Sequence, residues 1–182
     1  MRTVFIPTAG LPYSSTPWIT EDRRWFSGNG LATEDLELAT ATARDVENAL
    51  ARADLVYVAG GNTYFLLHHM KRTQFWDAAK NRDLMYSGAS AGAIVACPDI
   101  AYIGNLDDRG AAPDLADTVG AGLLDFRIMP HMNDERARPT IDRILSQWAA
   151  DTPLIKLTDD EAVVFEGSAW RVVESPPVLT KP

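Results

Sequence analysis

The chain has 182 residues and a formal net charge of −8, from 25 acidic and 17 basic side chains. That length suits one domain, over residues 1–182, with enough apolar chain to bury a core. No basic stripe of the kind that marks nucleic-acid binders is visible, and no apolar run approaches the ~20 residues of a membrane helix. Cys97 is the only cysteine, which excludes an intramolecular disulfide and a cysteine-based zinc site. Because the N-terminal apolar run is too short for a signal peptide, we expect a cytoplasmic protein that binds neither nucleic acid nor membrane.

Short apolar runs alternate with helical patterns through the first half of the chain. We expect strands over 3–6, 36–39, 54–59 and 84–87. Helices are expected over 17–26, 44–53 and 64–81, with a short one over 94–96. The run 54–59 is apolar after its first residue, as strands of a parallel sheet are, because helices cover both faces of such a sheet.

The second half of the chain contains one clear helical pattern and then three strands. Residues 139–150 form an amphipathic pattern whose inward side chains are Ile141, Ile144, Leu145 and Trp148. Strands are expected over 154–157, 162–165 and 170–173, with a hairpin turn at Gly167-Ser168 before the last. The alternation of strands and helices predicts an α/β fold with a mostly parallel sheet, to which the final hairpin adds an antiparallel pair.

The most informative motif is Gly88-Ala89-Ser90-Ala91-Gly92, which matches the pattern G-x-S-x-G. A serine at a sharp turn between a strand and a helix projects its hydroxyl from the edge of the sheet, and the small neighbours let the backbone turn. The helix that follows offers free N–H groups to a developing oxyanion. Ser90 is therefore a candidate nucleophile. The alternative interpretation is a tight connection with no catalytic role.

A serine nucleophile needs a base, and the chain has three histidines. His68 and His69 fall on an expected helix, where a packing or surface role is the ordinary interpretation. His131 follows an apolar run that ends in Pro130, so it lies in a loop at a strand end and is the best candidate base. Acidic side chains that could orient it lie on both sides, and composition does not choose among Asp99, Asp107, Asp108, Asp114, Asp117, Asp125, Asp159, Asp160 and Glu161.

A second glycine-rich strand end, Gly60-Gly61-Asn62-Thr63, is expected at the same edge of the sheet as Ser90, where α/β proteins place their ligand sites. The Gly61 N–H could point at an oxyanion. A phosphate cradle is the rival interpretation. Neither the P-loop nor the dinucleotide-binding motif occurs in the sequence, which weighs against nucleotide binding.

Four segments taken together are similar to a known family. They are V-F-I-P-T-A-G at 4–10, V-A-G-G-N-T at 58–63, G-A-S-A-G-A at 88–93 with A-C-P at 96–98, and P-H at 130–131. In this order they resemble the dipeptidase E family of serine peptidases, also called aspartyl dipeptidases, and more distantly cyanophycinase. The resemblance covers residues 3 to about 173.

The resemblance implies a three-layer α/β sandwich related to the class I glutamine amidotransferase fold. Family members usually begin with one more strand and helix. The chain is expected to lack that unit, which makes a homodimer plausible. The implied order Ser, His, Asp separates this family from the α/β-hydrolases, in which the acid precedes the histidine.

The resemblance also implies roles for particular residues. Ser90 would be the nucleophile, His131 the general base and Asp159 the orienting carboxylate, with Asp160 as the close alternative. The N–H groups of Gly61 and Ala91 would form the oxyanion hole. Two further residues would contact substrate, namely Asn62 at the pocket floor and Arg138 at a substrate carboxylate.

The leading hypothesis is a serine peptidase that hydrolyses short peptides, with Asp-X dipeptides among the candidates, and that needs neither metal nor cofactor. One alternative is an esterase or amidase that acts on a different acyl group. Another is a non-catalytic binding module that keeps the fold. The preferred substrate side chain and the choice between dipeptidase and carboxypeptidase cleavage stay open at this stage.

Overall fold

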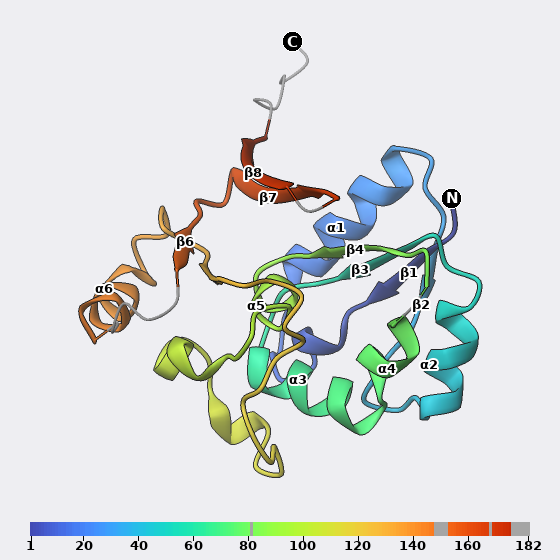
Figure 1. Ribbon diagram of the computed structural model, residues 1–182, viewed down its shortest axis with the longest axis horizontal. Coiled ribbons are helices and arrows are strands. Elements are labelled where there is room, and N and C mark those ends of the chain that lie inside the picture. Colours follow the sequence, from blue (N-terminus) through green and yellow to red (C-terminus); the bar gives the residue numbers. More distant parts are fainter. Residues whose placement is uncertain (81, 148–152, 168, 176–182) are drawn as a thin grey trace.

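A computed structural model describes residues 1–80, 82–147, 153–167 and 169–175. Its centre is a four-stranded parallel sheet with the strand order β2-β1-β3-β4 (Figure 1). These strands are β1 (Thr3–Ile6), β2 (Thr33–Asp35), β3 (Leu55–Val58) and β4 (Met85–Gly88). The parallel arrangement confirms the expected sheet, and the C-terminal ends of β1, β3 and β4 meet at one edge.

Helices cover both faces of this sheet, which gives three layers (Figure 1). Side chains alternate along β1, so that Val4 and Ile6 enter the larger core while Phe5 faces the other side. Helix α1 (Pro17–Gly28) packs on the Phe5 face through Phe26. The opposite face is covered by α2 (Ala43–Leu50), α3 (Thr63–Arg72) and α4 (Phe75–Ala79).

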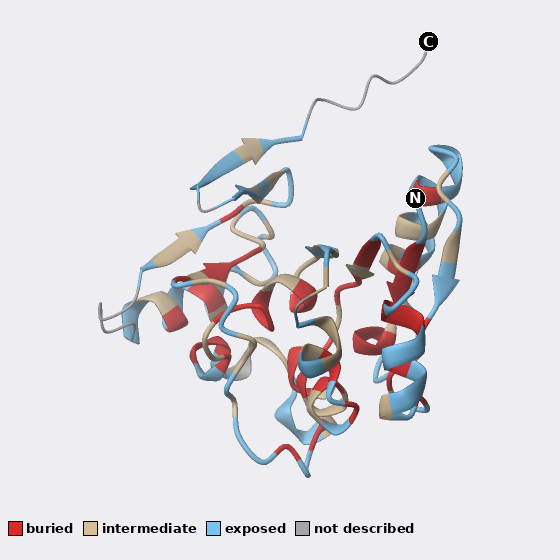
Figure 2. Cartoon of the chain, turned by 45° about the vertical axis from the view of Figure 1, so that its right-hand side comes forward, coloured by how far each residue is buried: buried red, intermediate tan, exposed pale blue. Residues whose placement is uncertain are grey.

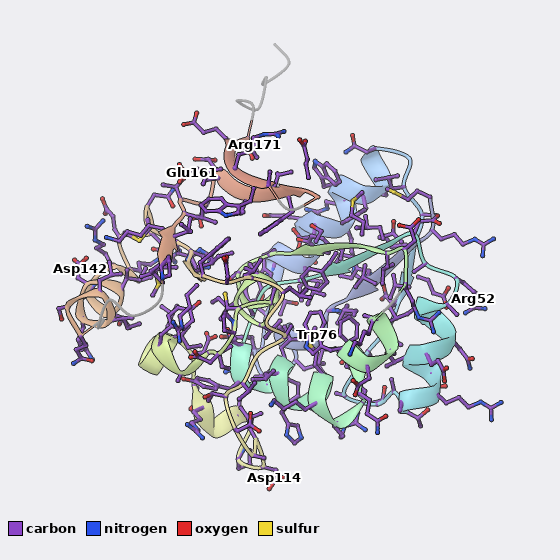
Figure 3. The ribbon with its side chains drawn as sticks, in the orientation of Figure 1. Arg52, Trp76, Asp114, Asp142, Glu161 and Arg171 are labelled. Atoms are coloured by element: carbon purple, nitrogen blue, oxygen red, sulfur yellow. The ribbon has the colours of Figure 1, made fainter. Side chains whose placement is uncertain are left out.

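The expected helix over 64–81 is wrong in its extent, because the structure divides it. Helix α3 ends where the Thr73 hydroxyl donates to the His69 carbonyl at 2.7 Å, and Gln74 then adopts a left-handed φ of 55°. The turn redirects the chain so that Phe75 is fully buried at the start of α4. The ring of Trp76, which Figure 3 labels on α4, lies beside that of Tyr86 of β4. The two ring centroids are 5.3 Å apart. Residue 81 lies outside the described ranges.

The strand expected over 36–39 is also wrong, since β2 occupies Thr33–Asp35 instead. Leu36 and Leu38 are buried, and the Leu36 N–H donates to the Phe5 carbonyl of β1 at 2.9 Å, but residues 36–39 form no strand. The Leu38 N–H donates to the Thr8 hydroxyl at 2.9 Å, which replaces the hydrogen bond that a neighbouring strand would have supplied.

Beyond β4 the chain builds two further small sheets. The short helix α5 (Ala91–Ile94) and the 3₁₀ turns η2 (Ala101–Leu106) and η3 (Arg109–Ala111) come first. Strand β5 (Arg127–Met129) then pairs in parallel with β6 (Leu154–Lys156), and α6 (Arg138–Gln147) connects them. The hairpin of β7 (Glu161–Glu166) and β8 (Ala169–Glu174) is antiparallel as expected, but it forms a sheet of its own and does not extend the parallel sheet. Trp148, expected to face inward, lies outside the described residues.

The burial pattern places the core around the parallel sheet (Figure 2). Buried residues gather on the central strands and on the helix sides that face them, while the β7–β8 hairpin is largely exposed (Figure 2). In the part of the chain that the structure describes, no helix is long and apolar enough to cross a membrane.

Candidate active site

The turn between β4 and α5 holds Ser90 in a conformation that few residues adopt. Its φ is 48° and its ψ is −108°, and it occupies the N-cap position of α5. A Cβ at Gly88 would lie 2.7 Å from the Ala93 nitrogen, and one at Gly92 would lie 3.0 Å from the Val58 Cβ. The two glycines therefore let α5 approach β3 and β4 closely, so that the local packing imposes the strained turn expected for a nucleophile.

Three side chains from separate parts of the chain meet at this turn. The Ser90 Oγ lies 2.8 Å from the His131 Nε2, and the His131 Nδ1 lies 2.6 Å from the Asp159 Oδ1. The contact with a carboxylate favours the tautomer with a proton on Nδ1, which leaves Nε2 free to accept the serine proton. The side chains of His131 and Asp159 are 35% and 51% exposed, so solvent and small solutes can reach the site.

The β5–β6 pair explains why residues 131 and 159 are neighbours. Parallel pairing brings the ends of both strands to the same edge, and the Met132 N–H donates to the Leu157 carbonyl at 3.0 Å just beyond them. The Asn133 side chain then accepts the Asp159 N–H at 3.0 Å. Of the two adjacent acids, it is the Asp159 carboxylate that contacts the imidazole, whereas the Asp160 carbonyl accepts the Ser175 N–H.

The Gly60-Gly61 turn lies directly against Ser90. A Cβ at Gly60 would be 3.2 Å from the Ser90 Cβ. Gly61 has a φ of 144°, and a Cβ there would overlap the Ala9 carbonyl, so a side chain is excluded for both reasons. Within the described residues, neither the Gly61 N–H nor the Ala91 N–H donates a hydrogen bond. Both amides are thus available to an anionic oxygen near Ser90.

Asn62 lies beneath this turn and is only 2% exposed. Its side-chain oxygen accepts the Phe65 N–H at 2.9 Å, which caps α3, and its amide nitrogen donates to the Asp108 carbonyl at 2.8 Å. The structure therefore ties Asn62 to the protein backbone on both sides. Its expected contact with substrate stays a prediction.

Arg138 lies at the start of α6, where its side chain is about half exposed. Its Nε donates to Asp142 at 2.8 Å, and a second nitrogen donates to the Met132 carbonyl at 3.3 Å. Figure 3 shows Asp142 at the outer edge of the molecule, so the guanidinium is held on that side of α6. A role at a substrate carboxylate likewise stays a prediction.

Asp107 is a site residue that the sequence analysis did not single out, having placed it among nine acids. Its carboxylate accepts the Thr63 N–H at 2.8 Å, and Tyr13 lies near it. Burial raises the pKa of this carboxyl above its ordinary 3.8, although its hydrogen bonds and the nearby His131 act in the opposite direction. No local pattern marks this acid, because its burial depends on the loop 11–16 and on the start of α3.

The described residues, 1–80, 82–147, 153–167 and 169–175, contain no group of three histidine, cysteine or acidic side chains placed to hold a metal ion. Cys97 is buried, and burial raises the pKa of its thiol. A hydroxyl, an imidazole in contact with a carboxylate, and two free amides gather around Ser90, and these are the kinds of group that acyl transfer uses.

A family model described as Peptidase family S51 matches residues 1–173. The chain belongs to peptidase family S51. Membership makes the protein a serine-type peptidase, and relatives named Peptidase E confirm the resemblance to the dipeptidase E family.

Individual S51 relatives match over most of the chain. An uncharacterized peptidase from Listeria monocytogenes is 31% identical over 168 residues, which are 90% of this chain and 81% of that protein. A Drosophila melanogaster protein named as a probable alpha-aspartyl dipeptidase is 30% identical over 137 residues, covering 69% of this chain and 55% of that protein.

A solved structure supports the fold. The crystal structure of a provisionally named peptidase E protein from Listeria monocytogenes matches with a TM-score of 0.88 and 28% identity. The match covers 96% of this chain and 86% of that one. The three-layer sandwich with a mostly parallel sheet, like that of class I glutamine amidotransferases, is therefore confirmed as the fold class.

Proposed function

We propose that this S51 peptidase hydrolyses short peptides through Ser90, His131 and Asp159. The observation that carries the proposal is the continuous contact from the Ser90 Oγ through both imidazole nitrogens to the Asp159 carboxylate. Each contact has hydrogen-bond length, and the strained backbone of Ser90 points the hydroxyl at the base.

In the first half of the reaction the Ser90 Oγ attacks the scissile carbonyl carbon while the His131 Nε2 takes the hydroxyl proton. The oxygen of the tetrahedral intermediate accepts the Gly61 and Ala91 N–H groups, each of which is worth ~3 kcal/mol of barrier by comparison with measured oxyanion holes. The C–N bond then breaks as the imidazolium returns the proton to the leaving amine. Asp159 holds the ring orientation and stabilises its positive charge throughout.

In the second half a water molecule attacks the acyl-enzyme ester. His131 takes a proton from that water, and Ser90 receives it when the ester bond breaks, which restores the enzyme. Because His131 and Asp159 are partly exposed, water reaches the ester without a conformational change.

For the substrate, we propose dipeptides that include an N-terminal aspartate. The support is the name of the Drosophila relative, an alpha-aspartyl dipeptidase. A panel of Asp-X, other dipeptides and blocked peptides would show whether this chain shares that preference, whether it removes residues from the carboxyl end, or whether it prefers esters.

The test compares four variants on that panel. Ser90→Ala should abolish hydrolysis, while Ser27→Ala, an exposed serine of α1, should match the wild type. Asp159→Asn should lower kcat by about 10³–10⁴, as loss of the orienting carboxylate does in serine proteases, and the adjacent Asp160→Asn should leave kcat within about twofold. Hydrolysis retained by Ser90→Ala would refute the mechanism. An equal loss in the two aspartate variants would refute the assignment of Asp159.

A further inference from the structure

Trp18 of α1 makes one polar contact, and it is with the glycine turn beside the nucleophile. Its indole Nε1–H donates to the Gly60 carbonyl at 3.0 Å. That carbonyl and the Gly61 N–H belong to the same peptide unit. Since the unit is trans, the two groups point in opposite directions. A donor that holds the carbonyl toward α1 therefore holds the N–H toward the opposite side.

We propose that Trp18 is a positioning residue that keeps the Gly61 N–H directed at the oxyanion. This inference rests on the proposed function, because it assigns Trp18 an effect on the rate of acyl transfer at Ser90. It adds to the site a side chain 42 residues away in sequence, on a helix that contributes no reacting group.

The peptide unit needs such a restraint because glycines flank it on both sides. Rotation about ψ of Gly60 and φ of Gly61 can turn the unit over, and neither residue has a Cβ to oppose the rotation. In the turned-over state the Gly60 oxygen would replace the N–H beside Ser90 and would repel the oxyanion. The Asn62 N–H is held on the Ala9 carbonyl at 2.7 Å, but that bond restrains the next unit along the chain. Among the described residues no other donor reaches the Gly60 oxygen.

Trp18 is itself held in place by its surroundings. Its neighbour Ile19 is buried and packs so closely on Gly10 that a Cβ there would overlap the isoleucine side chain. The Tyr13 ring meets the indole edge to face, with centroids 5.6 Å apart. The indole is thus held by α1, by the loop before it and by the core around Phe5, and its N–H reaches the glycine turn.

The test compares Trp18→Phe, which keeps an aromatic ring and removes the donor, with Trp25→Phe. Trp25 lies on the same helix and is 60% exposed, so its variant is a matched control. We measure kcat and KM on the peptide that the wild type cleaves fastest, and the rate at which a fluorophosphonate labels Ser90. In the adduct, the Ser90 Oγ is bonded to phosphorus, and an oxygen on that phosphorus takes the place of the oxyanion. The labelling rate therefore depends on the same N–H donors. Ser90→Ala is run in parallel, and thermal unfolding reports the folded fraction of every variant.

We expect Trp18→Phe to lower kcat and the labelling rate about tenfold, with KM within about twofold of wild type. Removing an oxyanion donor outright lowers kcat by about 10²–10³, and losing one restraint on it should lower kcat less. A purely structural role would lower the folded fraction and leave kcat per folded molecule unchanged.

Equal kcat in Trp18→Phe and Trp25→Phe, with Ser90→Ala inactive, would overturn this inference alone. Activity in Ser90→Ala, or a wild type that fluorophosphonate does not label, would overturn the proposed function and this inference together. Should Trp18→Phe fail to fold, 3-benzothienylalanine at position 18 keeps the bicyclic shape without the N–H. The same tenfold loss is expected of it, and wild-type rates would overturn the inference.

Discussion

Replacement of Gly92 by alanine tests whether close packing of α5 on β3 sets the geometry of the nucleophile. The added Cβ would lie 3.0 Å from the Val58 Cβ and would overlap the Val58 carbonyl oxygen. Carbon atoms in contact prefer ~3.5–4.0 Å, so α5 must move away from β3 by about 0.5–1 Å. Because Ser90 is the N-cap of α5, it moves with the helix, and the 2.8 Å contact with His131 is disturbed.

The displacement has two expected consequences for Gly92→Ala. Overpacking of this kind lowers the free energy of unfolding by about 1–3 kcal/mol. A misplacement approaching 1 Å at the reacting atoms lowers kcat by up to about 10²-fold. Kinetic assays below the unfolding transition, together with urea denaturation, separate the loss of rate from the loss of folded protein.

Gly28→Ala is the matched control, since a Cβ at this last residue of α1 would meet no described atom within 4 Å. It should keep wild-type kcat and equal or greater stability, by up to ~1 kcal/mol, because alanine restricts the unfolded chain more than glycine does. If Gly92→Ala matched this control in both kcat and stability, the packing argument for the nucleophile turn would be refuted.

Three further predictions concern stability. Asn62→Ala removes the cap of α3 and the bond to the 107–108 loop, and should lower the free energy of unfolding by about 1–2 kcal/mol in urea denaturation. Asp107→Asn should raise the Tm at pH 7, because the pKa of the Asp107 carboxyl is raised in the folded protein and its ionisation therefore destabilises the fold. The gain in Tm should shrink as the pH is lowered towards 3.8, where the carboxyl is protonated. A gain in Tm that does not depend on pH would contradict this. Burial lowers the pKa of His69 from 6.5 to about 4, and the nearby His68 and Arg72 act in the same direction. Between pH 6.5 and 4 the His69 side chain is therefore protonated in the unfolded chain and neutral in the folded protein. His69→Gln should therefore lose less stability than wild type between pH 6.5 and 4, and parallel Tm profiles would contradict this.

Much of the fold could be predicted because its signals are local. The run at 54–59 is apolar on both faces and forms β3, and the alternation of strands with helices predicted the parallel sheet. The predicted elements were wrong where a hydrogen-bond partner distant in the sequence sets the backbone conformation. Leu36 and Leu38 are buried, but the Leu38 N–H donates to the Thr8 hydroxyl, 30 residues away, in place of a partner on a neighbouring strand.

The sequence by itself indicated the turn at Ser90, because Gly88 and Gly92 allow a close approach of α5 to the sheet that a Cβ would block. Composition left nine candidate acids and the family resemblance implied Asp159, but the contact of Asp159 with His131 depends on the parallel pairing of β5 with β6. The same holds for Asp107, whose burial depends on Tyr13 and Thr63, and for the Trp18 bond to Gly60. Such contacts join residues tens of positions apart, and periodicity over a few residues carries no information about which ends of which elements will meet.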